Sequence, residues 1–118
     1  MGLSDELIQA SLLGEAVDHG PALVFVADET MRYAAVNARA CELLGYKRSE
    51  LVGMEVTDIA RYDEAAAEYG QMKDERGRAD VAVLTRKDGT TFRFRYIAGE
   101  TTVAGMPYYV SVGWPEPE

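Results

Sequence analysis

The apolar residues at the start of the chain recur three or four positions apart, which is the spacing of one helix face. This period predicts a helix over residues 3–18 that ends before Gly20. The apolar stripe is wide for a helix at one end of a small domain, so it has to pack on the domain's own sheet or on a partner. The seam comprises Leu3, Leu7, Ala10, Gly14 and Val17.

Beyond Gly20 the pattern changes to that of strands. A continuous apolar run at 22–27 predicts a buried strand, and a polar turn leads from it into a second strand at 31–36. The Asp88-Gly89 pair is a strong signal for a two-residue hairpin, because such a turn wants positive φ, which glycine supplies without strain. Three strands are therefore predicted in the second half of the chain, at 80–86, 90–99 and 108–114.

Short helices are predicted between the second and third strands. Asn37 can cap the first, since its side-chain oxygen can accept from an early helical amide, and Gly45 ends it where a positive φ is easiest. Ser49 begins a second, one-turn helix that ends at Gly53. A longer helix is expected over residues 62–75, where acidic residues and a run of alanines favour helical structure.

Composition narrows the classes of protein that this pattern allows. The 118 residues can form one domain with a single core, and an apolar content of 47% is typical of a soluble globular chain. A net charge of -8 and a pI near 4.6 argue against nucleic acid or an anionic membrane as the main partner. The chain has no long apolar run, no basic leader and one cysteine, which together predict a cytoplasmic protein that no membrane holds.

One continuous motif and the order of the elements resemble the PAS sensory-domain family. The motif begins with Asn37 and a helix of small residues, continues through Leu44-Gly45-Tyr46 and a serine cap, and closes with Glu50-Leu51 and Gly53. The basic-Asp-Gly hairpin at Asp88 is a second point of similarity. Each piece is weak alone, but together, in order and at this spacing, they make a strong resemblance over roughly residues 20 to 114.

The resemblance implies an α+β PAS fold with a five-stranded antiparallel sheet of order 2-1-5-4-3, small helices on one face and an N-terminal flanking helix. The chain would then divide into the flanking helix at 1–20, a PAS domain at 21–114 and a tail at 115–118. It also implies an ion pair between Glu50, on the second small helix, and the hairpin residue Arg86 or Lys87.

Two positions that matter in flavin-binding relatives differ in this chain. The light-oxygen-voltage type forms a cysteine adduct just after the position of Gly53, where this chain has Val56, and its flavin-contacting Gln aligns with Gly113. Haem-binding relatives need an axial ligand, most often a histidine near the helix at 62–75, whereas the sole histidine here is His19. We therefore expect neither flavin nor haem, and no Cys and His set has the spacing of a metal site.

Catalysis is not expected either. One histidine and one cysteine do not form a nucleophile-base pair at any spacing that the chain offers. Cys41 is expected to be a small buried core residue, because Arg39 and Glu42 do not provide the environment that activates a thiol.

The resemblance places a ligand pocket between the sheet and the small helices. Two interpretations stay open: large side chains fill this space as an ordinary core, or it holds a small apolar or mixed-polarity ligand oriented by tyrosine hydroxyls and Ser111. The expected lining residues are Phe25, Ala27, Leu44, Ile59, Leu84, Phe94, Tyr96, Tyr109 and Ser111.

The leading interpretation is a bacterial, cytoplasmic PAS module for sensing, signal relay and protein interaction, with its output in another domain or partner protein. The alternative is a purely structural homodimerisation domain with a filled core and no ligand. A homodimer through the N-terminal helix is expected because its apolar stripe is too wide to stay in water; the competing arrangement is a helix folded back on its own sheet. The expected interface residues are Leu3, Leu7, Ala10, Leu13, Gly14 and Val17.

Overall fold

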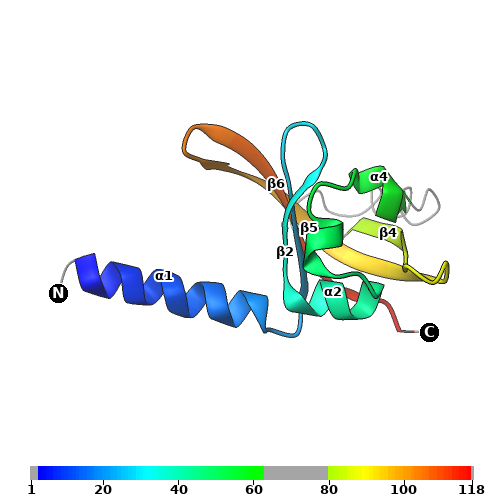
Figure 1. Cartoon of the computed structure of the whole chain (residues 1–118), viewed down its shortest axis with the longest axis horizontal. Coiled ribbons are helices and arrows are strands. Elements are labelled where there is room, and N and C mark those ends of the chain that lie inside the picture. The colour runs from blue at the N-terminus through cyan, green and yellow to red at the C-terminus, as the bar shows by residue number, and fades with distance from the viewer. Residues whose placement is uncertain (1–2, 63–79, 118) are drawn as a thin grey trace.

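The computed structural model describes residues 3–62 and 80–117. One antiparallel sheet carries short helices on one face, and one long helix extends away from the domain (Figure 1). The elements in chain order are α1 (Leu3–Asp18), β1 (Leu23–Ala27), β2 (Tyr33–Val36), α2 (Ala38–Leu44), α3 (Arg48–Leu51), α4 (Val56–Ile59), β3 (Ala60–Tyr62), β4 (Asp80–Thr85), β5 (Thr91–Val103) and β6 (Met106–Pro115).

The sheet has six strands in the order β2-β1-β6-β5-β4-β3, and every neighbouring pair is antiparallel. Five of these strands are the predicted ones in the predicted order, so the α+β PAS fold is confirmed. The sixth is β3, a three-residue edge strand in which Ala60 lies opposite Leu84. Three residues are too few to show a period, so the sequence does not predict β3. Tyr62, the expected start of a helix at 62–75, belongs to this strand, and the rest of that predicted helix lies outside the described residues.

The short helices owe their boundaries to local hydrogen bonds. Asn37 caps α2 as predicted, and Gly45 ends it with a φ of 79° and an amide that donates to the Cys41 carbonyl. The helix α3 begins one residue before the predicted Ser49, because Lys47 takes the capping position. The Glu50 carboxylate accepts from the Lys47 amide at 2.8 Å, which satisfies a donor that the helix itself leaves unpaired.

The hairpin between β4 and β5 is one residue longer than predicted. The Arg86 amide donates to the Thr90 carbonyl at 2.7 Å, so Lys87, Asp88 and Gly89 form a three-residue loop. Among these three, Gly89 alone has a positive φ, of 90°, whereas a two-residue type I′ turn needs positive φ at both central residues. The conformational role predicted for Gly89 is confirmed, and the predicted turn length is wrong.

A two-residue turn occurs instead at the tip of the β5–β6 hairpin. Val103 pairs with Met106, and Ala104 and Gly105 between them have φ values of 52° and 81°. The outer half of this hairpin projects beyond the rest of the sheet as an arm (Figure 1). Positive φ at Ala104 is unfavourable for a residue with a Cβ, so this tip stores a small strain.

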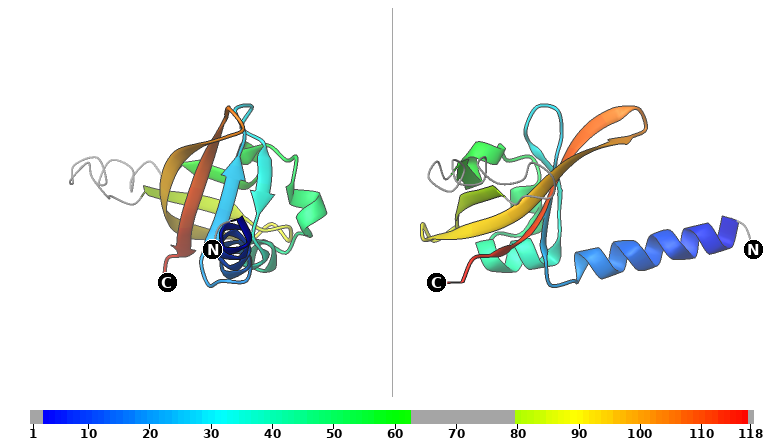
Figure 2. Two further views of the ribbon diagram at one scale, coloured as in Figure 1. Left: turned by 90° about the vertical axis from the view of Figure 1, so that its left-hand side faces the viewer. Right: turned by 180° about the vertical axis from the view of Figure 1, so that it is seen from behind.

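The hydrophobic core lies between α2–α4 and the sheet face that these helices cover, which we call the inner face. Strand alternation sends Leu23 and Phe25 of β1 to the inner face, together with Leu84 of β4 and Phe94 of β5. The opposite, outer face receives the alternate residues of the same strands. α1 leaves the domain at one end of the sheet; the right-hand view of Figure 2 shows it extending away, and the left-hand view looks along its axis.

Candidate functional site

A cavity of about 100 Å³ lies on the inner face of the sheet. Strands β1, β2, β4, β5 and β6 all contribute to its wall because every second residue of a strand points to the same face. Seven of the nine predicted pocket residues line it: Phe25, Ala27, Leu84, Phe94, Tyr96, Tyr109 and Ser111. The other two, Leu44 and Ile59, are 0% and 2% exposed and belong to the packed core beneath α2 and α4.

Five further residues that the sequence does not predict also line the cavity: Met31, Tyr33, Val56, Ala60 and Ala82. Ala82 could have been found, since it shares the inward alternation of Leu84 on the same strand. The position of Tyr33 has no such signal, because a register shift in the β1–β2 ladder changes the alternation there.

Aromatic rings form much of the cavity wall. The rings of Phe94 and Tyr96 stack with their centroids 5.3 Å apart and their planes at 11°. Phe25 meets Phe94 edge to face, with centroids 5.5 Å apart, and also contacts Tyr33 at 5.5 Å. Offset and edge-to-face pairs of this kind stabilise a core beyond their buried area. The rings therefore hold one another in place beside the cavity.

The cavity lining carries hydroxyl groups, and within the described part of the chain it carries no charged side chain. Burial, reinforced by the negative charge of Asp58, raises the pKa of Tyr33 well above its ordinary value. Its hydroxyl therefore stays protonated and can donate a hydrogen bond. Tyr96, Tyr109 and Ser111 bring further hydroxyls. This lining suits an uncharged molecule with one or two polar atoms.

The structure shows what surrounds Val56 and Gly113, the two positions that differ from flavin-binding relatives. Val56 lies on the cavity wall and offers no thiol. At Gly113 a Cβ would lie 2.0 Å from the Arg95 carbonyl oxygen and 2.6 Å from the Tyr96 Cα. Strands β5 and β6 approach so closely here that no side chain, glutamine included, fits without moving the backbone.

Asn37 joins the end of α1 to three other segments of the domain. Its side chain is 4% exposed. Its amide nitrogen donates to the carbonyls of Val17 and Ala22, each at 2.8 Å. Its oxygen accepts from the backbone amides of Val24 at 3.0 Å and Ala40 at 3.2 Å. The sequence predicts the capping bond to α2, but the bonds to α1, to the linker and to β1 come from the tertiary fold.

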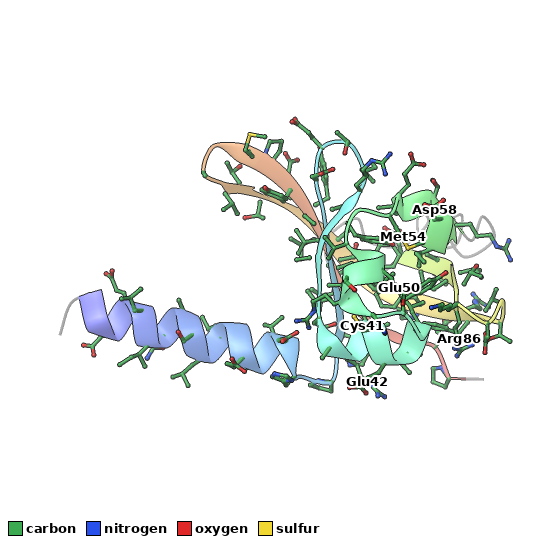
Figure 3. All side chains as sticks on the ribbon, in the orientation of Figure 1. Cys41, Glu42, Glu50, Met54, Asp58 and Arg86 are labelled. Carbon is green, nitrogen blue, oxygen red and sulfur yellow. The ribbon has the colours of Figure 1, made fainter. Side chains whose placement is uncertain are left out.

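Asp18, the last residue of α1, provides a second link to the short helices. Its carboxylate accepts from the Ala38 amide of α2 at 3.0 Å and pairs with Arg48, the first residue of α3. Cys41 of α2 is also close to Arg48, and Figure 3 shows it on the side of the domain from which α1 departs. Burial raises the pKa of the Cys41 thiol despite that cation, and a raised pKa disfavours the reactive thiolate.

The hairpin between β4 and β5 is fastened to the same short helices. The Lys87 ammonium lies 2.7 Å from the Glu50 carboxylate, which confirms the ion pair implied by the resemblance. The Lys87 amide donates to the Leu44 carbonyl at 2.9 Å, and the Arg86 guanidinium donates to the Leu43 carbonyl at 3.2 Å. Glu50 and Arg86 accordingly lie on the same side of the domain in Figure 3.

The apolar side chains of α1 are exposed along its length. Leu7 and Leu13 are each 66% exposed, and Ala10, Gly14 and Val17 are exposed as well. The side chain of Leu3, the remaining predicted interface residue, lies outside the described residues. α1 is therefore not folded back on its own sheet, the arrangement that competes with a homodimer.

Where α1 meets the sheet it forms one wall of an apolar groove of about 380 Å³. Leu13, Gly14 and Val17 line the groove from α1, and Val24 and Val26 line it from the outer face of β1. Three of the predicted interface residues thus come together with an apolar part of the sheet.

The outer face continues across β5 and β6 with both apolar and charged residues. Trp114, the single tryptophan of the chain, is 54% exposed there, next to Arg95 in the β5–β6 ladder. The carboxylate of Glu116 pairs with Arg95 and with Arg93, so this end of β6 is held down on the outer face.

Metal-ligating side chains do not cluster in the described residues: no three of His, Cys, Asp and Glu are grouped so that they could hold an ion. Within the same residues, every helix is too short or too polar to cross a bilayer.

The solved structures that this chain resembles include PAS domains and light-oxygen-voltage proteins. The PAS domain of an HTR-like protein from Haloarcula marismortui has a TM-score of 0.72 at 20% identity, over 96% of this chain and 97% of that one. A PAS domain from a two-component sensor histidine kinase has a TM-score of 0.74 at 13% identity, over 94% and 99%. An RNA-binding light-oxygen-voltage receptor has a TM-score of 0.68 at 18% identity, over 97% of this chain and 35% of that one.

These TM-scores establish the shared fold, whereas identities of 20% or less do not transfer a ligand or a partner to this chain. Comparison with curated protein sequences gave no match. A family model described as PAS domain, however, matches residues 21–105, which is well over half of the chain. The chain therefore belongs to the PAS domain family.

Proposed function

We propose that this PAS domain is a sensory and signal-relay module that acts through protein interaction rather than catalysis. The observation that carries the proposal is the attachment of α1. One end of this helix is bonded to the domain through Asn37 and Asp18, while its apolar length is exposed to solvent. A helix held only at its base can change direction when the domain beneath it changes.

The contacts at that base give a physical route for relay. Asn37 bonds to α1 and to β1, whose inward residues Phe25 and Ala27 line the cavity. Asp18 bonds to α2 and α3, which cover the inner face. A small shift of β1 or α3 would therefore alter the hydrogen bonds that orient α1, and the relay would consist of the resulting change in the direction of the helix.

We propose that the domain forms a homodimer through α1, with the side chains of Leu3, Leu7, Ala10, Leu13, Gly14 and Val17 in the interface. Exposed apolar residues on one long helix mark an interaction surface. The apolar groove between α1 and β1 can bind the α1 of a second copy. Gly14 lets the two helices approach closely there because it has no side chain. The output would lie in another domain or in a bound protein, in the cytoplasm.

The alternative function is a purely structural homodimerisation domain with a filled core. The size of the cavity favours it, because packed aromatic rings leave a space of only about 100 Å³. Both functions include the homodimer. They differ in whether a change at the inner face of the sheet alters the direction of α1.

The dimer can be tested on the full chain with one matched pair of variants. Leu7→Glu places a charge on the interface seam, whereas Leu12→Glu places the same charge on the far side of α1, where Leu12 is 59% exposed. Light scattering should show a dimer for the parent and for Leu12→Glu, and a monomer for Leu7→Glu. A monomeric parent at high micromolar concentration would refute the dimer.

Relay can be tested by spin labels on α1 that report the distance between the two helices of the dimer. Substituting Asn37 by Ser should broaden or shift this distance while the core stays folded by circular dichroism. An unchanged distance would favour the purely structural alternative.

A further inference from the structure

On the basis of the sensory function proposed above, we infer that the inner-face cavity takes an uncharged molecule no larger than a single six-membered aromatic ring. The inference concerns the chemical class of the ligand, and it follows from the size, charge and shape of the lining.

Size sets the upper limit. The cavity measures about 100 Å³. An engineered apolar cavity of about 150 Å³ is known to bind benzene. The cavity here is smaller than that one, so a single ring already takes up all of its space, and fused ring systems such as flavins or porphyrins exceed it.

Charge sets the second limit. The lining that the structure describes contains hydroxyls and hydrocarbon, with no cation or anion. An ionised ligand would lose its hydration without gaining a countercharge from these lining side chains, which is unfavourable. Because Tyr33 holds its proton, its hydroxyl can serve a neutral acceptor but cannot act as a counterion for a cation.

Shape favours a flat ligand. Phe94 and Tyr96 stack nearly parallel, and Phe25 stands edge-on to Phe94, so rings packed against one another make up much of the lining. Flat molecules pack well on such surfaces. Met31 and Tyr109 line the cavity and are themselves partly exposed, so the lining reaches the molecular surface, where a small ligand can pass.

Three probes separate these limits: phenol, benzoate and 2-naphthol. Phenol and benzoate share one ring and differ in charge, while phenol and 2-naphthol share a hydroxyl and differ by one ring. In NMR titrations of the full chain, phenol should shift the methyl signals of Ala27 and Ala82 saturably. Benzoate and 2-naphthol should bind at least about tenfold more weakly, a free-energy difference of about 1.4 kcal/mol.

Two variants on one strand then tie the binding to the cavity. Ala82→Leu adds volume to the lining and should abolish the phenol response, whereas Leu84→Ala removes volume and should let 2-naphthol bind. One variant should lose a ligand and the other should gain one. A general loss of folding cannot explain both results, because an unfolded variant cannot gain a ligand.

Absence of phenol binding to the parent, or equal binding of benzoate or 2-naphthol, would overturn the inference. Light scattering on the same samples keeps the two proposals apart. A dimer that binds no probe would refute the ligand class and leave the proposed α1 interface intact. A monomer that binds phenol would refute the α1 interface and support the ligand class.

Discussion

The two faces of the sheet are built from alternate residues of the same strands, yet they differ in what covers them. On β5, Phe94 points to the inner face and is 2% exposed, whereas Ile97 points to the outer face and is 54% exposed. The inner face is covered by α2–α4. The outer face of β1 is met by one end of α1 alone among the described helices.

This difference separates two tasks. Residues on the inner face hold the domain together, since their burial removes apolar area from water within one chain. Apolar residues on the outer face and on α1 contribute little to the fold of one chain and are available for association. Alternation in a sequence thus tells which face a residue occupies, but not whether its cover comes from the same chain or from another.

The largest expected effect comes from comparing a substitution on the inner face with one on the outer face of the same strand. Phe94→Ala should lower the free energy of unfolding by about 3–5 kcal/mol, because it removes a ring that contacts Phe25 and Tyr96. Ile97→Ala, on the same strand, should cost below about 1 kcal/mol. Urea unfolding at a concentration where the chain is monomeric measures both. Similar losses would mean that the outer face is as well packed as the inner one.

Asn37 connects the two sides, so its removal should affect both. Asn37→Ala leaves a buried backbone amide on α2 and partly buried backbone groups on α1 and β1 without this partner, and it should cost about 2–3 kcal/mol. Asn37→Ser keeps a capping oxygen for α2 but has no amide to reach Val17 and Ala22, so we expect roughly half that loss.

Hydrogen exchange locates the loss caused by Asn37→Ser. Amides at the end of α1 should exchange faster while those of α2 stay protected. Equal acceleration in both helices would show that Asn37 does not separate the attachment of α1 from the capping of α2.

The hairpin tip offers a smaller change that involves neither face. Ala104→Asn should raise the free energy of unfolding by about 0.5 kcal/mol, because Asn-Gly is the preferred pair for a turn with two positive φ values. Ala104→Val should lower it, since a β-branched residue tolerates that backbone poorly. Thermal unfolding distinguishes the two directions, and stabilisation by valine would disprove the assigned turn.

The smallest effect concerns the Glu50–Lys87 pair and depends on pH. Its hydrogen bonds from Lys87 and from the Lys47 amide lower the pKa of Glu50 below its ordinary value of 4.5. Above that value the carboxylate is charged in both states and the stabilisation is full; it is lost as the pH falls through the lower pKa of the folded state. When the pH is lowered from about 6 to about 3, the melting temperature of Glu50→Gln should therefore fall by less than that of the parent.

The acid dependence should not vanish in Glu50→Gln. Hydrogen bonds from Thr30 and Thr90 also lower the pKa of Asp28 and Asp88, respectively. Identical melting curves for parent and variant across this range would show that the exposed Glu50–Lys87 pair is energetically silent.

Sequence periodicity was sufficient for most of the fold, because five strands and two capped helices carry local signals. Asn37 and Gly45 mark the ends of α2 by their own chemistry, and Gly89 marks its loop in the same way. β3 was missed because three residues show no period. The turn lengths at Gly89 and Gly105 depend on which residues pair across the strands, and a single turn dipeptide does not determine that.

The candidate site was harder to predict than the fold. Phe25, Leu84 and Phe94 face the cavity through alternation, which is local information. The Asp18–Arg48 pair joins residues 30 positions apart, and no spacing rule predicts it. The direction of α1 is likewise set by tertiary bonds at its base, so the sequence left its position open between the chain's own sheet and a partner.

Trp114 gives the outer face its own optical signal. It is the single indole of the chain and is half exposed, whereas the cavity on the other face is surrounded by phenylalanine and tyrosine rings. A partner that covers this part of the outer face would exclude water from the indole and move its fluorescence to shorter wavelength. A ligand in the cavity would leave that emission in place, so one unlabelled spectrum tells which side of the sheet has been occupied.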